Sequence, residues 1–199
     1  GSDIRALGVA ERADIRRTIE NADLEIIGLH WLLAKTEGLH LTSPDAAVRQ
    51  RTGQYFVELT RLCRDLGGRV LVFGSPVQRQ LLPGVTVEQG LDYAAEVFRG
   101  LVPELEACDC VLAVEPLAPV EGNFLNTAAD AVRLIEMVGS PHCRLHLDCK
   151  AMSAESSTIP ELLRRHRDLL EHFHANDANR QGPGFGELDF PPIFAALGE

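Results

Sequence analysis

The sequence predicts an α/β fold built around a parallel sheet. Short apolar runs rich in Val, Ile and Leu alternate with longer stretches that have helical periodicity or helix-start residues. The runs are mostly continuous rather than alternating in apolar character, which is typical of strands that are covered on both faces of a sheet. We therefore expect strands at residues 24–30, 69–75, 110–115, 144–148 and 170–175.

The stretches between these runs predict helices. Ser43-Pro44-Asp45 offers an N-cap and a proline at the first helical position, so a helix should run from there to Leu66 and end at Gly67-Gly68. Thr127 with Asp130 three residues later resembles a capping box in which Asp replaces Glu, and an apolar helix face follows. Further helices are expected at about residues 10–22, 86–106, 159–168 and 191–198.

Composition limits the class of protein and its partners. The chain has 199 residues, of which 45% are apolar and 24% charged, with no linker or low-complexity tract, so we expect one domain over residues 1–199. The net charge of −10 argues against nucleic acid and anionic lipid as partners. No run reaches the roughly 20 apolar residues of a membrane helix, and Gly1-Ser2-Asp3 does not begin a signal peptide. These observations predict a soluble, cytoplasmic protein.

The five cysteines are predicted to be reduced, buried apolar residues. Their number is odd and no CxxC pair occurs, which does not suit a disulfide framework. They are Cys63, Cys108, Cys110, Cys143 and Cys149.

Three of the expected strands end in a side chain that can bind a metal ion. These are Glu115, Asp148 and His174. Because ligands of parallel α/β folds bind at the carboxyl ends of the strands, the three side chains can converge although they are distant in sequence. Two carboxylates with one imidazole suit Mn²⁺, Mg²⁺ or Co²⁺, and Zn²⁺ is an alternative. The competing interpretation is that acidic residues at strand ends only cap the helices that follow.

Four further residues have a functional and a structural interpretation. His146 and His172 lie two residues before Asp148 and His174, so they point to the same side of the sheet and lie one layer below the metal site. They could orient the ligands, or they could be core histidines with satisfied hydrogen bonds. His30 and Trp31 follow the first strand and could form part of a substrate wall, although loop packing explains them as well.

The motifs around these residues resemble one family. Val114-Glu115-Pro116-Leu117, Leu147-Asp148-Cys149-Lys150 and the segment from His172 to Arg180, followed by the loop 182–187, are similar to the sugar phosphate isomerase/epimerase superfamily. Members of that superfamily are xylose isomerase-like TIM barrels and include ketose 3-epimerases. The resemblance extends over about residues 24–197.

The resemblance implies roles for individual residues. It implies that Glu115, Asp148 and His174 bind a divalent metal, with Mn²⁺ as the first expectation, and that Glu115 is also one of two catalytic acid/base carboxylates. Glu121 and Arg180 match positions that contact substrate hydroxyls in ketose 3-epimerases. Ala151 stands where those enzymes carry a substrate-binding histidine, which is a departure from their pattern.

The activity implied is isomerisation or epimerisation of a small sugar, sugar phosphate or hydroxy-keto acid. The reaction moves a proton next to a carbonyl through a metal-stabilised enediolate. A homodimer is an expected form by the same resemblance. Two other functions are alternatives, namely a non-catalytic sugar-binding barrel and, with less support, a zinc phosphodiesterase similar to endonuclease IV.

The spacing of the strands bears on how much of a barrel the chain contains. The expected strands start about 36 residues apart, so eight units would need roughly 290 residues, against 199 in this chain. A (β/α)8 TIM barrel is therefore expected to be incomplete at both ends, with five of its eight strands visible. The resemblance implies that the fourth metal ligand, a Glu that is also the second catalytic carboxylate, follows Glu199.

Overall fold

The sheet of this protein has five strands that are all parallel. The structure is a computed structural model that describes Ile4 and residues 7–199. Gly1-Ser2-Asp3, from which we argued against a signal peptide, lies outside the described residues. The strands follow one another in chain order across the sheet, as the sequence predicts for serial β–α units. They are β1 (Gly28–His30), β2 (Val70–Phe73), β3 (Val111–Val114), β4 (Cys143–Asp148) and β5 (Leu170–His174).

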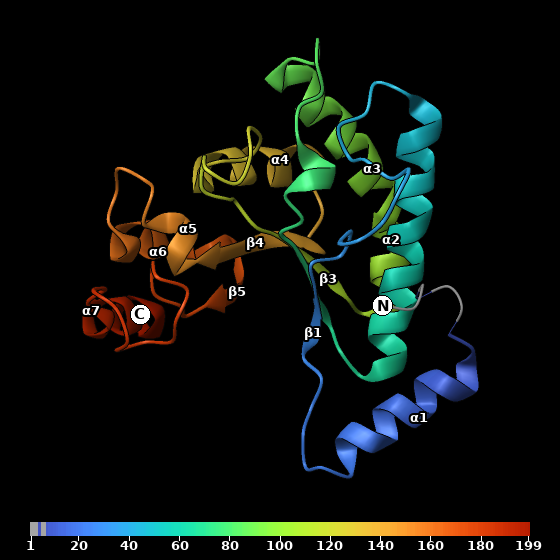
Figure 1. Cartoon of the computed structure of the whole chain (residues 1–199), viewed down its shortest axis with the longest axis horizontal. Coiled ribbons are helices and arrows are strands. Elements are labelled where there is room, and N and C mark those ends of the chain that lie inside the picture. The colour runs from blue at the N-terminus through green and yellow to red at the C-terminus, as the bar shows by residue number, and fades with distance from the viewer. Residues whose placement is uncertain (1–3, 5–6) are drawn as a thin grey trace.

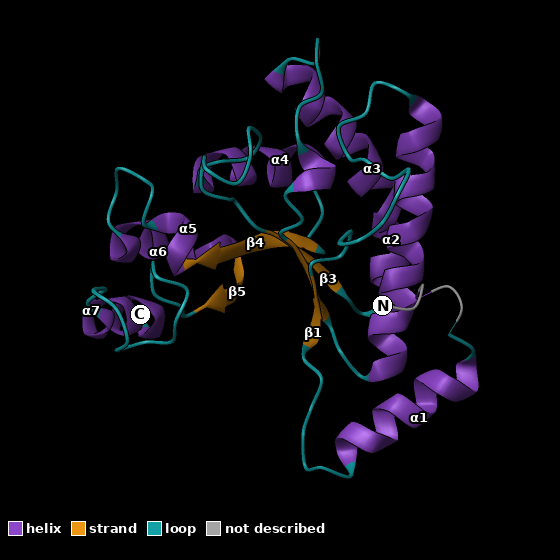
Figure 2. Ribbon diagram, viewed as in Figure 1, coloured by secondary structure: helices purple, strands orange, loops and turns teal. Residues whose placement is uncertain are grey.

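The sheet curves into an open half-barrel, with β1 and β5 at its two edges (Figure 1). Helices follow the strands around its outer side (Figure 2). They are α1 (Val9–Glu20), α2 (Ala46–Leu66), α3 (Val87–Cys108), α4 (Ala128–Val138), α5 (Cys149–Met152), α6 (Ile159–His166) and α7 (Phe190–Gly198), with short 3-10 turns at Val77–Arg79 and Arg167–Leu169. The predicted α/β class and incomplete barrel are confirmed.

The core lies between the sheet and these helices. Every residue of β3 is buried, whereas the edge strand β5 is only half-buried along its length. Phe56 of α2, Phe73 of β2 and Phe98 of α3 meet edge to face, with ring centroids 5.5–5.7 Å apart. This aromatic cluster is fully buried and fixes the two longest helices against the middle of the sheet.

Two predicted boundaries were wrong. The first strand begins at Gly28 rather than at residue 24, because Gly28 pairs with Val70 and the residues before Val70 belong to the end of α2 and its left-handed cap at Gly67. The second helix is capped by Asp45, whose carboxylate accepts from the backbone N of Ala47 at 2.8 Å. Residues 43–44 therefore precede this helix instead of starting it. The capping box of Thr127 and Asp130 is confirmed.

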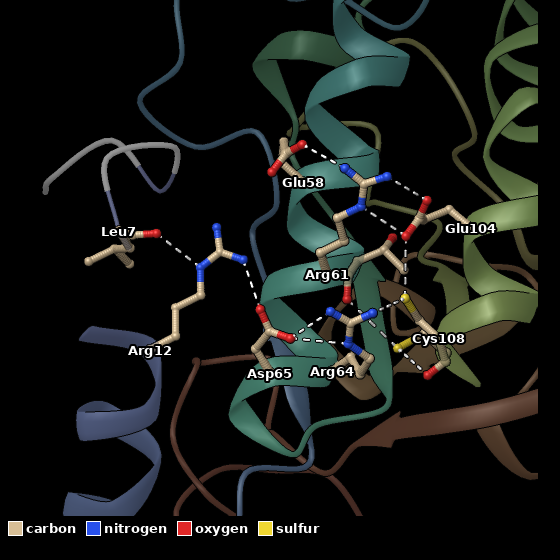
Figure 3. A network of polar contacts seen from close by, with 10 residues as sticks. Leu7, Arg12, Glu58, Arg61, Arg64, Asp65, Glu104 and Cys108 are labelled. Atoms are coloured by element: carbon tan, nitrogen blue, oxygen red, sulfur yellow. Dashed lines mark hydrogen bonds and ion pairs between the residues drawn. The ribbon is translucent and has the colours of Figure 1, made fainter. Parts of the chain in front are cut away.

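None of the residues of helix α1 is buried, and polar contacts connect this helix to the rest of the molecule. Arg12 donates to Leu7 O at 3.1 Å and to Asp65 of α2 at 2.9 Å (Figure 3). In the same network, Arg61 of α2 binds Glu104 of α3 through two hydrogen bonds of 3.0 Å. The network links three successive helices on the outer surface.

The cysteine prediction is confirmed, since all five side chains are buried and unpaired. None of the helices in the described part of the chain has the length and apolar character that a membrane span requires.

Candidate active site

Three neighbouring strands bring the predicted metal ligands together. Glu115 directly follows β3, Asp148 is the last residue of β4, and His174 is the last residue of β5. Asp148 and His174 are also paired in the register of the sheet. With His146, these side chains offer one ligand atom each, and all four atoms lie within 4.8 Å of one another. The cluster formed by these four residues is called the ligand cluster below.

Glu115 is buried in a space that depends on a glycine. Its side chain is 5% exposed, and a Cβ atom added at Gly74 would lie 1.7 Å from Glu115 Oε2. No larger residue at position 74 leaves the carboxylate where it is. Burial, reinforced by the negative charge of Asp148, raises the pKa of Glu115 to about 7. A carboxyl group with this pKa can hold or release a proton near neutral pH.

The buried Arg79 fixes the backbone at the same point. Its Nη1 donates to the carbonyl oxygen of Glu115 at 2.7 Å, and its guanidinium lies 5.0 Å from the centre of the Phe73 ring. Burial lowers the pKa of Arg79 to about 10, while the nearby charges of Glu115 and Glu121 oppose that shift. Arg79 therefore stays charged at neutral pH and anchors the end of β3.

Asp148 is oriented by three hydrogen-bond donors or ionic neighbours. Its Oδ1 accepts from the backbone N of Ala151 at 3.0 Å, which makes it the N-cap of α5. Its Oδ2 accepts from Asn176 Nδ2 at 2.7 Å and lies 3.5 Å from His174 Nδ1. Burial alone would raise the pKa of Asp148, but the interactions with His174, Ala151 and Asn176 hold that pKa below its ordinary value. The carboxylate is thus ionised at neutral pH.

Three histidine rings pack edge to face beside the carboxylates. The ring centroid of His146 lies 4.1 Å from that of His174 and 5.3 Å from that of His172. His146 is completely buried, and burial followed by the charges of the neighbouring histidines lowers its pKa well below 6.5. His146 therefore has a neutral ring. We expected this residue one layer below the metal site, but its ring lies within the ligand cluster itself. His172 is outside the cluster and contacts it through ring packing.

The donor set of the ligand cluster fits a divalent metal ion. Within the described part of the chain, Glu115 Oε2 and both ring nitrogens of His146 are buried and have no hydrogen-bond partner. Buried polar atoms are normally paired, so three unpaired ones on two adjacent side chains indicate a site for a charged ligand. Two carboxylates and two imidazoles are a donor set used for Mn²⁺, Co²⁺ and Zn²⁺.

A cavity of about 250 Å³ opens beside the ligand cluster. All four residues that we expected to touch substrate lie in its wall: His30, Trp31, Glu121 and Arg180. The ring centroid of His30 lies 5.8 Å from that of Trp31 and 5.1 Å from that of His174, so these rings extend from the cluster toward the opening. Trp31 is 59% exposed, which places it at the rim.

The sequence analysis gave no site role to several residues of this cavity. Among them are Gly74, Asn176 and Lys150, whose Nζ lies 2.7 Å from Glu121 Oε1. Gly74 lies near the end of the second predicted strand and Asn176 directly follows the fifth, so their position at strand ends was the available signal. Lys150 projects from α5, a four-residue helix that the sequence analysis did not predict. Ala151, in contrast, is buried outside the cavity wall.

Comparison with known proteins assigns the family. The family model described as xylose isomerase-like TIM barrel matches residues 3–199. The chain belongs to this family. D-psicose 3-epimerase of Agrobacterium fabrum is 30% identical over 196 residues, which cover 94% of this chain and 65% of that protein. L-ribulose 3-epimerase of Mesorhizobium japonicum is 32% identical over 161 residues, which cover 79% of this chain and 53% of that protein.

Solved structures of the family agree with the fold described above. A crystal structure of D-psicose 3-epimerase in the presence of D-fructose matches with a TM-score of 0.84 and 25% identity, covering 98% of this chain and 67% of that chain. The chain spans about half to two thirds of the length of the two epimerases from Mesorhizobium japonicum and Agrobacterium fabrum. The resemblance seen in the sequence motifs is confirmed at the level of the family.

Proposed function

We propose that this protein is a metal-dependent epimerase of small ketoses. The observation that carries the proposal is the ligand cluster, in which the buried Glu115 opens onto a cavity of about 250 Å³. The similarity to D-psicose and L-ribulose 3-epimerases supports a ketose as substrate.

Glu115 is the residue we assign to proton transfer. Its Oε2 has no hydrogen-bond partner within the described structure, and one oxygen of its carboxylate lies within 4.8 Å of a ligand atom of every other member of the cluster. A positioned carboxyl group of this kind can remove the proton on one face of the carbon next to the substrate carbonyl, which typically contributes about 10²- to 10⁴-fold to the rate. Inversion of that carbon also requires a second acid, which delivers a proton to the opposite face of the planar intermediate. Glu115 serves one of the two faces.

Glu115, His146, Asp148 and His174 would hold the metal ion, and we propose Mn²⁺ as the ion that this donor set takes. A bound divalent ion would polarise the carbonyl and neighbouring hydroxyl of the ketose and stabilise the negative charge that develops when the proton leaves. His30 and Trp31 would cover one side of the sugar at the rim, and Arg180 would reach its polar groups from the loop after β5.

The test combines metal analysis with proton exchange. We expect the wild-type protein to bind Mn²⁺ and to incorporate solvent deuterium at the carbon next to the carbonyl of at least one ketose in a panel. Glu115→Ala should lose both properties, while Glu37→Ala, at an exposed position, should keep them. Equal metal content in all three proteins would overturn the metal site. Ketose binding without any deuterium incorporation would favour a non-catalytic sugar-binding protein instead.

A further inference from the structure

The wall of the cavity contains an ion pair between Glu121, which the sequence resemblance places against substrate hydroxyls, and Lys150, to which the proposed function gives no role. Lys150 Nζ lies 2.7 Å from Glu121 Oε1, and the two side chains are only 20% and 22% exposed. Both residues line the cavity beside Glu115, Asp148 and His174. The other carboxylate oxygen, Glu121 Oε2, is buried and has no hydrogen-bond partner within the described chain. The carboxylate of Glu121 is therefore incompletely satisfied.

The backbone holds both members of this pair in place. The backbone N of Lys150 donates to Asn176 Oδ1 at 3.0 Å, and Asn176 Nδ2 in turn donates to Asp148 Oδ2 at 2.7 Å. On the other side, Gln80 Nε2 donates to the carbonyl oxygen of Glu121 at 3.0 Å. Lys150 is thus positioned through the same amide that orients Asp148, so the ion pair keeps a fixed place relative to the ligand cluster.

The use of lysine at this position is unusual for the chain. The sequence contains 17 arginines and only two lysines, Lys35 and Lys150. The other ion pairs among the described residues have arginine or histidine as the basic partner. An ammonium differs from a guanidinium because it is a compact donor with three N–H groups that can point in different directions. One N–H of Lys150 is taken by Glu121, which leaves two for a ligand.

The pair has the chemistry of a receptor for two neighbouring hydroxyl groups. The free N–H groups of Lys150 can donate to one hydroxyl oxygen, and Glu121 Oε2 can accept from another hydroxyl. Since the charges of the two side chains cancel, this part of the wall does not attract a phosphate or carboxylate as an isolated cation would. A neutral sugar with adjacent hydroxyls is the ligand that satisfies all of these groups together.

We propose that Lys150 is a substrate-contacting residue and that the Lys150–Glu121 pair selects neutral sugars carrying two adjacent hydroxyl groups. The inference rests on the proposed function for its ligand class, but it concerns binding rather than proton transfer. Lys150 is accordingly a specificity-determining residue and takes no proton from the reacting carbon.

The first experiment measures ketose binding with Mn²⁺ present in wild-type protein, Lys150→Met and Lys35→Met. The Kd of Lys150→Met should rise about 10- to 100-fold, as for the loss of hydrogen bonds to a charged group, while Lys35→Met should match the wild type. A set of ketoses that each lack one hydroxyl should show one position at which the wild type discriminates and Lys150→Met does not, next to a position, read by Glu121, at which both proteins discriminate. A purely structural ion pair would weaken binding of every analogue by the same factor, which would overturn the proposal.

The second experiment requires no substitution. Amine-reactive labelling followed by peptide mass spectrometry reports separately on the two lysines of this chain. A bound ketose should slow the labelling of Lys150 and leave that of Lys35 unchanged, and equal labelling of Lys150 with and without sugar would contradict the inference.

The outcomes separate this inference from the proposed activity. Ketose binding that depends on Lys150, without deuterium exchange, would refute the epimerase activity and support the contact. Exchange that is unaffected by Lys150→Met, with unchanged discrimination among deoxyketoses, would support the activity and refute the contact. A wild-type protein that binds no ketose would overturn both.

Discussion

Replacing Glu115 by Gln should stabilise the metal-free protein, although it removes a residue of the proposed active site. The pKa of Glu115 rises from 4.5 to about 7 in the folded protein. The native state therefore binds more protons than the unfolded state between these values, and its stability falls as pH rises through that window. At about 1.36 kcal/mol per pKa unit, the ionised carboxylate costs about 3 kcal/mol at pH 8 and less than about 1 kcal/mol at pH 5. Gln has nearly the same shape and carries no charge.

Urea unfolding in the presence of a chelator measures this effect. Glu115→Gln should be more stable than the wild type by about 2–3 kcal/mol at pH 8, with a smaller difference at pH 5. Mn²⁺ at 1,000 times the Kd of the wild type should reverse the order, because it stabilises the folded wild type by about 4.1 kcal/mol, whereas the variant lacks one ligand and gains less. Glu37→Gln, at an exposed carboxylate, should match the wild type throughout. Equal stability of wild type and Glu115→Gln at pH 8 without metal would refute this reasoning.

Three other predictions follow from the same geometry. Gly74→Ala should displace the Glu115 carboxylate and lower the affinity for Mn²⁺ in calorimetric titrations. Gly100→Ala is the control, because a Cβ atom added there has no neighbour within 4 Å. It should leave the Mn²⁺ affinity unchanged and alter the stability by no more than about 1 kcal/mol. Mn²⁺ affinity of the wild type should fall as pH drops below about 7, because a proton on Glu115 must then be displaced, and a pH-independent affinity would contradict the assigned pKa. His146→Leu should reduce the amount of bound Mn²⁺ measured by elemental analysis, whereas His172→Ala, outside the ligand cluster, should retain it. The opposite result would make His172 a metal ligand in place of His146.

The sequence predicted the strands and the convergence of three site residues because both depend on simple periodic features. Continuous apolar runs identify buried parallel strands, and the carboxyl ends of such strands lie at one edge of the sheet. Glu115, Asp148 and His174 therefore meet as expected. The same reasoning placed His30 and Trp31 in the cavity wall, because they mark the end of β1.

The features that the sequence did not predict depend on depth and on short-range geometry. The alternation of side chains puts His146 on the same face as Asp148, but it does not give the 4.1 Å between the His146 and His174 rings that brings His146 among the ligands. Lys150 enters the cavity because the single turn of α5 follows Asp148 directly, and a four-residue helix has no periodicity to detect. Gly74 acts through the absence of a side chain, which only the position of Glu115 makes visible.

The open edge strand β1 has a consequence for how this protein can change over time. The ligand cluster takes its residues from β3, β4 and β5 and the positions that directly follow them, whereas β1 contributes His30 and leads into the exposed Trp31 at the rim. Substitutions in the segment after β1 can therefore alter the shape of the opening without moving a metal ligand. This part of the cavity wall and the ligand cluster reside in different stretches of chain, so the opening can vary while the ligand cluster is preserved.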